Sequence, residues 1–230
     1  MLQIYVLIQI WSGAYRTQSH LDGISYGKTV TYLCVVNMLM WLNQSTIPWY
    51  VADRIREGKI ATELIRPIPF PLQVLSHQVG YTIARTTALA GMIPVAVVVA
   101  GLEAPATVGL FVVSALLSYA VSVGLYGLLG SAGFWLHETS GIVWAFSLVN
   151  AFLAGSFIPL ALFPPGVREV VELLPFGAMG YTPAAIYSGM VSGAAAVQAV
   201  LVQFFWCVTL VAVIALVWRR AERGIVSQGG

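Results

Sequence analysis

Charged side chains are scarce in this chain. Lys, Arg, Asp and Glu make up 9% of its 230 residues, whereas about a quarter of a soluble domain is charged. Hydrophobic residues account for 59%, and the net charge is only +2. An intrinsically disordered chain needs low hydrophobicity, and a nucleic-acid-binding protein needs a large basic patch. The composition therefore excludes both classes and predicts that lipid surrounds most of the chain.

Cysteine and metal-ligand clusters are also scarce. The two cysteines, Cys34 and Cys207, lie within apolar runs and form neither a disulfide framework nor a metal-binding spacing. We interpret them as small buried hydrophobic residues. His20 and His77 do not combine with cysteines or carboxylates into a metal site. We therefore expect no metal and no directly bound cofactor in this chain.

Long apolar runs dominate what is present. A helix that crosses a bilayer needs about 20 mostly apolar residues, and runs without two-residue alternation are not typical of barrel strands. We predict an all-α, polytopic membrane protein with about six transmembrane helices in a single domain, residues 1–230. The expected spans are residues 1–13 (in part), 29–49, 86–102, 107–129, 140–162 and 196–218.

Two of these spans have uncertain starts. At 1.5 Å per residue, the run 1–13 reaches only about 20 Å of a hydrocarbon core that is about 30 Å thick. We interpret it as the outer part of a first span that is truncated. The third helix is expected to start near residue 72, ahead of its apolar run.

Basic residues set the expected orientation. Of the eleven Lys and Arg residues, five lie in residues 51–85 and three in the C-terminal tail. Cytoplasmic loops carry the excess of Lys and Arg, so we expect these two regions to face the cytoplasm. Residues 14–28, 103–106 and 163–192 would then face outward.

Residues 52–72, the charged segment, carry more charge than any other stretch. Apolar residues recur there at helical spacing, Gly58 interrupts the pattern, and Pro67 ends it. The pattern predicts a short amphipathic cytoplasmic helix followed by a rigid, extended turn. Such a helix lies on the membrane surface or docks to a soluble partner. An ordinary positive-inside loop is the alternative.

Residues 157–190, the outer segment, are apolar but broken by proline and glycine. Pro159 interrupts the fifth span, residues 167–174 can form two turns of amphipathic helix, and Pro175 ends that helix. Irregular backbone at membrane depth must be buried in protein or line a cavity. We therefore predict a re-entrant or interfacial hairpin that closes the outer mouth of a pathway. An external loop with a surface helix is the alternative.

A few polar residues interrupt the predicted spans. Asn150 lies in mid-span and could form a hydrogen bond between helices or contact a substrate. Arg85, near the inner end of the third span, could extend to the lipid headgroups or take part in coupling or gating. Ser114, Ser118 and Ser122 recur every four residues on one helix face, which predicts close helix packing.

Both unusual segments resemble one family. RIREGKIATELIRPIPFPL is similar to the cytoplasmic IRxGxLxxxLLRP stretch of the permeases of type-2 ATP-binding-cassette exporters, with Ile60 where leucine is preferred. The stretch from Gly155 to Met190 resembles the family pattern GxxxPLxxFPxxLxxxxxxLPFxxxxxxPxxxxxG. Its matching residues are Gly155, Pro159, Leu160, Phe163, Pro164, Leu174, Pro175, Phe176, Pro183 and Gly189. The resemblance is to small six-span members and covers nearly the whole chain.

The resemblance implies a permease subunit in a cell membrane, most typically the cytoplasmic membrane of a prokaryote. It implies a second permease, identical or related, and soluble ATPase subunits that bind ATP and Mg. It also implies export of an amphipathic drug, antibiotic, lipid-like molecule or peptide. The implied ATPase contacts are Arg54, Arg56, Glu57, Gly58, Ile60, Leu64, Arg66 and Pro67. The implied extracellular gate consists of Phe157, Pro159, Leu160, Phe163, Pro164, Pro175 and Phe176.

Three other functions are alternatives to this one. An ion-gradient-driven secondary transporter needs mid-span carboxylates, but all nine Asp and Glu residues map to predicted loops or interfaces. A membrane-embedded enzyme needs a clustered catalytic or metal site, and we find neither that nor a Walker A loop. A non-transporting assembly or sensor subunit stays open. We therefore expect no enzymatic activity in this chain itself.

Overall fold

The computed structural model describes residues 2–16, 20–102, 104–136 and 139–228, without the side chains of residues 61, 64, 92, 95, 99, 100 and 221–228. Within this part the chain is almost entirely helical, which confirms the all-α prediction. The strands described are β1 (His20–Leu21) and β2 (Ile24–Ser25), an antiparallel pair. Asp22 and Gly23 turn between them with positive φ.

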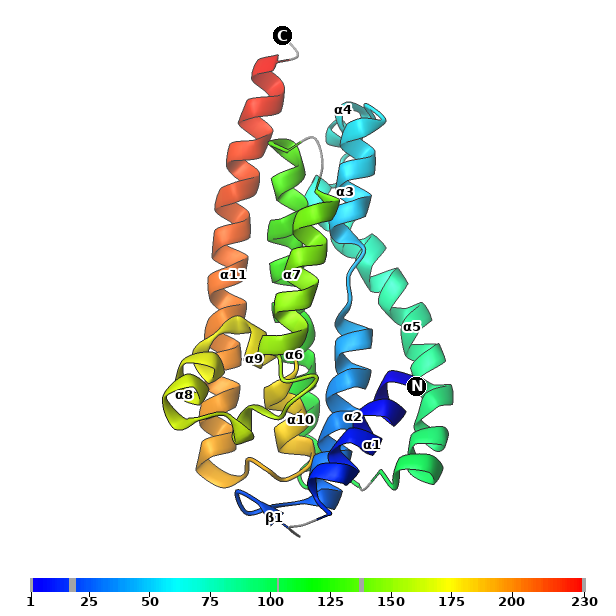
Figure 1. Cartoon of the computed structure of the whole chain (residues 1–230). Coiled ribbons are helices and arrows are strands. Elements are labelled where there is room, and N and C mark those ends of the chain that lie inside the picture. Colours follow the sequence, from blue (N-terminus) through cyan, green and yellow to red (C-terminus); the bar gives the residue numbers. More distant parts are fainter. Residues whose placement is uncertain (1, 17–19, 103, 137–138, 229–230) are drawn as a thin grey trace.

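Long helices run roughly along one axis and form an elongated bundle (Figure 1). They are α1 (Leu2–Ala14), α2 (Tyr26–Asn43), α5 (Phe70–Ala100), α6 (Val108–Ser131), α7 (Ser140–Leu153) and α11 (Gly193–Gln228). Helix α1 accompanies only the half of the bundle near β1. The charged segment lies at the other end, where α11 also finishes (Figure 1).

By length and composition alone, two helices of the described part are long and apolar enough to cross a membrane: Val108–Phe134 and Gly193–Arg220. Helices α1 and α7 are shorter apolar helices. Many apolar side chains on α11 face outward, such as Leu201 and Val211, which are 61% and 69% exposed. A bilayer supplies the apolar surroundings that such a surface needs. The six-span count itself stays a prediction.

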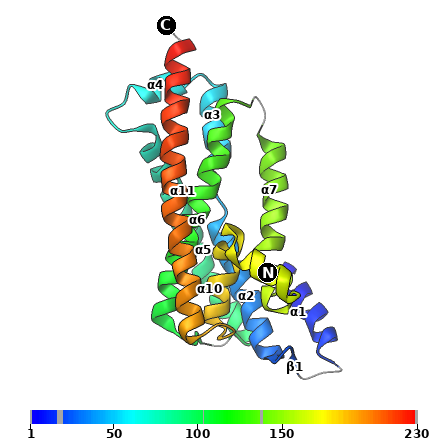
Figure 2. The same ribbon diagram turned by 90° about the vertical axis from the view of Figure 1, so that its left-hand side faces the viewer.

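Of two helix boundaries, one lies close to the sequence expectation and the other differs from it. Helix α5 begins at Phe70, close to the expected start near residue 72. Helix α7 ends at Leu153 and does not continue to residue 162, because Gly155 adopts a positive φ and Pro159 follows. Helix α7 also stands to one side of the bundle (Figure 2), with Trp144 and Leu148 exposed.

The predicted span 29–49 is broken. Helix α2 ends at Asn43, and α3 (Ile47–Arg56) begins after residues 44–46, where Gln44 is extended. In a continuous helix the Pro48 ring would clash with the carbonyl of Gln44, four residues earlier. Helix α3 is therefore a separate element that packs against α6 and α5, and it carries the first part of the charged segment.

Candidate functional site

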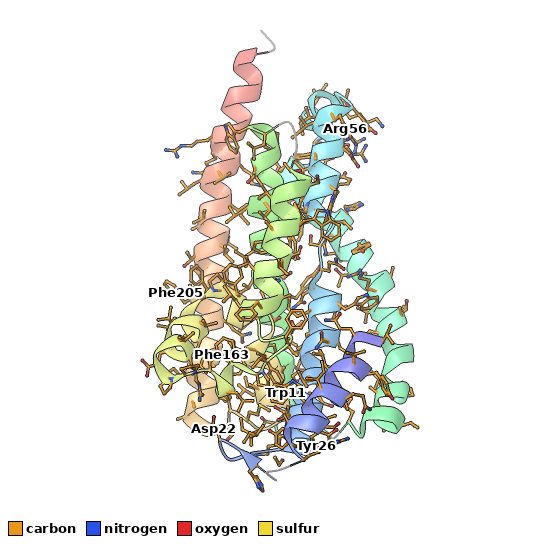
Figure 3. The ribbon with its side chains drawn as sticks, in the orientation of Figure 1. Trp11, Asp22, Tyr26, Arg56, Phe163 and Phe205 are labelled. Carbon is orange, nitrogen blue, oxygen red and sulfur yellow. The ribbon has the colours of Figure 1, made fainter. Side chains whose placement is uncertain are left out.

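The two segments singled out in the sequence lie at opposite ends of the bundle. Figure 3 shows Arg56 at one end and Phe163, with Trp11 and Asp22, toward the other. The charged segment consists of the end of α3, a turn at Gly58, helix α4 (Ile60–Leu64) and a non-helical stretch that leads into α5. Gly58 has φ +67°, a left-handed conformation that favours glycine, so the chain can turn sharply there.

An ion pair joins the two short helices of the charged segment. The Nε atom of Arg54 lies 3.2 Å from the carboxylate of Glu63, whose side chain is only 3% exposed. The Arg54 guanidinium also lies over the Tyr50 ring, 4.8 Å from its centre. Tyr50 and, to a lesser degree, Glu63 raise the pKa of Arg54. The pair therefore fixes α4 against α3.

The remaining charges of this segment are exposed. Arg56 pairs with Asp53, and Lys59 lies 2.8 Å from the carboxylate of Glu57. Lys59 lowers the pKa of that carboxyl below its usual value, so Glu57 is ionised at neutral pH. These groups form a solvent-facing surface of mixed charge.

Gln73 of α5 holds the turn that follows α4. Its amide donates to the backbone carbonyls of Glu63, at 3.0 Å, and Ile68, at 2.9 Å, and accepts a bond from Arg66 at 3.3 Å. Pro67 is exposed within this turn. The side chain of Leu64, another expected contact residue, lies outside the described part.

An aromatic and aliphatic cluster fixes the base of the charged segment. Ile47 and Val51 of α3 are buried with Phe70 of α5 and Trp218 of α11, and Ile60 packs at the edge. The ring centre of Trp218 lies 5.3 Å from that of Phe70, and a 3₁₀ turn, η1 (Ala132–Phe134), also packs against Trp218. The charged segment is thus exposed on its outer side but fixed where it meets α5 and α11.

The outer segment is a series of short helices, and all but the last of them begin at or just after a proline. Its elements are η2 (Leu160–Leu162), α8 (Pro165–Leu173), α9 (Pro175–Met179) and α10 (Tyr181–Tyr187). A proline suits the first helical turn because its missing N–H needs no partner there. Pro175 therefore both ends α8, as the sequence predicts, and begins α9.

The turn that enters the outer segment is held by other helices. Each of the carbonyls of residues 155–157 accepts one side-chain bond, from Tyr32 at 2.9 Å, Asn37 at 3.1 Å and Trp11 at 3.2 Å. Gly155 has φ +75°, and a Cβ atom there would overlap the Tyr32 hydroxyl. Only glycine fits this position without rearrangement.

The expected gate residues divide by burial. Leu160, Pro159 and Pro175 are buried, Phe163 and Phe176 are half-buried, and Phe157 and Pro164 are exposed. The ring of Phe176 packs against Phe146 of α7 at 5.8 Å between centres. Helix α10 is almost wholly buried, and the re-entrant hairpin that closes a pathway stays a prediction.

Helix α9 is held by side chains from three long helices. The carbonyl of Met179 accepts bonds from Asn43 of α2, at 3.1 Å, and Ser118 of α6, at 2.6 Å. The carbonyl of Ala178 accepts a bond of 2.8 Å from Gln203 of α11. All three side chains are buried. The end of α2 is therefore bound directly to the outer segment.

The serines of α6 do more than allow close packing. Ser114 donates to Gln203 at 2.8 Å, Ser118 accepts from Asn43 at 2.7 Å, and Ser122 donates to the carbonyl of Asn43. Asn43 and Gln203 were not among the residues predicted from the sequence. Each is an amide side chain within an apolar run, where a polar group needs a hydrogen-bond partner, and this pattern could have identified both.

A second buried network builds the break after α2. The side-chain oxygen of Gln78, on α5, accepts bonds from the Ser45 hydroxyl at 2.8 Å and the Thr46 N–H at 3.2 Å. Ser45 in turn accepts from the N–H of Ile47 at 3.1 Å. The backbone N–H groups of Thr46 and Ile47, which the break removes from a helix, are therefore bonded by side chains.

Arg85 and Asn150 have different surroundings. The Arg85 guanidinium lies over the rings of Trp41 and Tyr81, donates to the carbonyl of Trp41, and bonds Gln44 at 2.9 Å. It therefore caps the end of α2, and its predicted place near the headgroups or in coupling stays a prediction. Asn150 is buried on α7, and its side-chain oxygen has no partner in the described part.

Comparison with known proteins identifies the family. A family model described as ABC-2 family transporter protein matches residues 1–229. No curated protein and no solved structure matches the chain. The family match confirms the resemblance carried by the charged and outer segments. With its almost wholly helical architecture and its apolar outward surface, the chain belongs to the ABC-2 transporter family and is a membrane permease component of an ABC transporter.

Proposed function

We propose that this protein is the permease subunit of an ATP-driven exporter in a cell membrane. The charged segment docks a separate soluble ATPase, and the outer segment is the extracellular gate. One observation carries the proposal: Asn43, the last residue of α2, holds the carbonyl of Met179 in α9. Only residues 44–46 separate Asn43 from α3, which carries the docking surface. A displacement of α3 is therefore transmitted to the outer segment through a few bonds.

The charged segment has the properties of a docking element. Its exposed pairs, such as Lys59 with Glu57, can exchange for contacts with another protein at little cost. Its base is buried against Trp218 and Phe70, so a force on α3 moves the segment as a unit. ATP and Mg bind on the partner ATPase, and binding of ATP brings two ATPase copies together beneath two permeases.

The class of the transported substrate follows from the side chains of the long helices that would line a pathway. Helices α5 and α6 contain no Asp or Glu, so they cannot bind a strongly cationic solute by charge pairing, and Arg85 is their single Lys or Arg residue. An amphipathic molecule suits these apolar helices. The absence of mid-span carboxylates also disfavours an ion-gradient-driven mechanism.

The test is recovery of the ATPase with tagged full-length protein purified from membranes of native cells. The docking variant carries Glu57→Ala and Arg66→Ala, and the control carries Glu169→Ala and Arg16→Ala, the same residue types at the other end. We expect wild type and control to recover a soluble ATPase and the docking variant to lose it. Equal recovery by the docking variant would contradict the docking site. Folded wild type without any ATPase would contradict the function itself.

A transport assay separates the proposal from its rival. Inside-out membrane vesicles should accumulate a fluorescent amphiphile when ATP is added, and a protonophore should leave that uptake intact. Uptake that needs no ATP and stops with the protonophore would establish a secondary transporter instead.

A further inference from the structure

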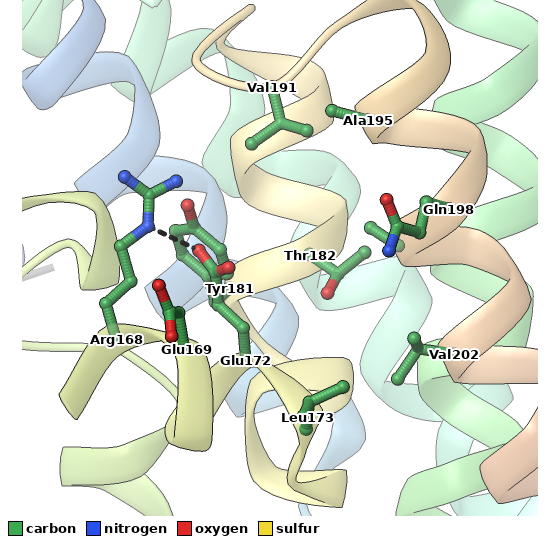
Figure 4. A pocket seen from close by; sticks show the side chains of 11 residues that line it. Arg168, Glu169, Glu172, Leu173, Tyr181, Thr182, Val191, Ala195, Gln198 and Val202 are labelled. Carbon is green, nitrogen blue, oxygen red and sulfur yellow. Dashed lines mark hydrogen bonds and ion pairs between the residues drawn. The ribbon is translucent and has the colours of Figure 1, made fainter. Parts of the chain in front are cut away.

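A cavity lies between the outer segment and the last helix. Its volume is about 310 Å³, which is within the range of small-molecule sites, about 300–1,000 Å³. Helix α8 contributes Arg168, Glu169 and Glu172, helix α10 contributes Tyr181 and Thr182, and α11 contributes a largely apolar wall with Gln198. Figure 4 shows Tyr181 beside the Arg168–Glu172 pair, with Thr182 and Gln198 toward α11.

The Tyr181 hydroxyl is an unpartnered polar group in this cavity. Tyr181 is only 3% exposed, and its hydroxyl makes no direct hydrogen bond in the described part, although Arg168 and Glu172 are the charged groups beside it. The end of the ring points toward the Arg168–Glu172 pair that lines the cavity (Figure 4). A buried hydroxyl without a partner costs free energy that a bound polar group can recover. The hydroxyl can accept a bond from such a group.

The charges around the hydroxyl favour a cation. Arg168 lies 2.8 Å from Glu172 and is neutralised by it. Glu169 forms no ion pair in the described part. Asp22 lines a second cavity that shares Arg168, Glu169 and Glu172, so three carboxylates face one guanidinium. An anionic group would meet a carboxylate excess there, whereas an ammonium group would meet acceptors.

The opposite wall favours an apolar chain. Ala195, Ala199 and Val202 of α11 line the cavity, and Leu173 of α8 lies at its side with 62% of its surface exposed. The indole N–H of Trp206 donates to the Leu173 carbonyl at 2.8 Å and so holds the end of α8 on α11. Polar acceptors therefore face a rigid apolar wall across one cavity.

We propose that this cavity binds an amphiphile whose head is a primary ammonium group. The ammonium lies between Glu169 and the Tyr181 hydroxyl, and the alkyl chain lies along α11. The head can belong to a free long-chain amine or to a lipid such as phosphatidylethanolamine. The site is remote from the charged segment and does not depend on ATPase docking.

The experiment uses the full chain in nanodiscs of phosphatidylcholine and a decylamine probe that carries a photoactivatable group. Labelled peptides are mapped by mass spectrometry, and apparent affinity is measured by competition with unlabelled decylamine. The variants are Glu169→Gln and Tyr181→Phe, and the control is Glu57→Gln, the same chemical change at the other end. We expect labelling in α8 and α11, and each site variant to bind about threefold to tenfold more weakly than the control.

Each outcome has a defined meaning. Loss of binding in both variants, with the control unchanged, supports the site. Equal labelling of all three would show nonspecific partitioning only and would overturn it. Competition by decyl sulfate as strong as that by decylamine would overturn the ammonium assignment. Phosphatidylethanolamine in the nanodisc that displaces the probe identifies a lipid as the occupant, whereas displacement by free amine alone identifies a soluble amphiphile.

Discussion

The two ends of the molecule are built on different principles. In the charged segment, exposed ion pairs lie over one buried apolar base, and Gly58 turns in open space. In the outer segment, buried helices are held by hydrogen bonds to their backbone carbonyls, and Gly155 turns against the Tyr32 hydroxyl. A surface that docks a partner needs contacts that can be exchanged, whereas a gate that closes a pathway needs one specific packing arrangement. The same chain therefore places adaptable contacts at one end and specific ones at the other.

Two glycines test this contrast with the largest expected effect. Gly155→Ala adds a Cβ atom that overlaps Tyr32 in a left-handed turn, so we expect destabilisation of about 3 kcal/mol or more. Gly58→Ala meets no atom within 4 Å, so only the backbone term of about 1 kcal/mol applies. Thermal unfolding of both variants in detergent measures the difference. Equal effects would show that the outer turn is as adaptable as the inner one.

The bond between α2 and α9 should have an intermediate effect. Asn43→Ala removes donors to Met179 and Ser118, and we expect a loss of about 1–2 kcal/mol. Ser118→Ala and the double variant complete a cycle, which should be non-additive because the three groups share one network. If the proposed function holds, Asn43→Ala retains the ATPase but transports less per ATP hydrolysed. Additive effects with unchanged transport would show that the bond transmits nothing.

The ion pair within the charged segment should have a smaller effect. Arg54→Ala leaves the Glu63 carboxylate buried without its partner, and one of its oxygens already lacks a hydrogen bond. Because Arg54 is itself 30% exposed, solvent screens the pair, and we expect a loss of about 1 kcal/mol. Glu63→Gln removes the charge and should cost less. Unfolding measurements that rank the two variants the other way round would contradict this explanation.

The exposed pair Glu57–Lys59 should show the smallest effect, visible in titration but not in unfolding. Lys59 lowers the pKa of Glu57, so the favourable contact is present above the ordinary carboxyl pKa and is lost as pH falls through the lowered value. Lys59→Ala should return the pKa upward, as NMR titration of labelled glutamate would detect. An unchanged pKa would show that the pair does not persist in solution.

Part of the candidate site could be predicted from the sequence because its signals are local. Proline at residues 67, 159 and 175 marks element boundaries wherever the chain folds, and the charge of residues 52–72 places them outside lipid. The break after α2 was missed although Pro48 signals it. The apolar run through residues 29–49 outweighed one proline, which lies only in the second position of α3. The contacts of Arg85 could not be predicted, because Trp41 and Gln44 lie at the end of another helix, 44 and 41 residues earlier in the sequence.

Residue types and their spacing suffice to show that the chain is helical and surrounded by lipid, which of its segments are unusual, and the family to which these segments point. Composition and local backbone limits decide those properties, and they act within a few residues. The three-dimensional packing was needed to show that Asn43 bonds Met179, that Gln203 bonds Ala178, and that the Tyr181 hydroxyl faces a cavity without a direct hydrogen bond. A buried polar group must find a partner, but the helix that supplies it is selected by packing across the whole bundle.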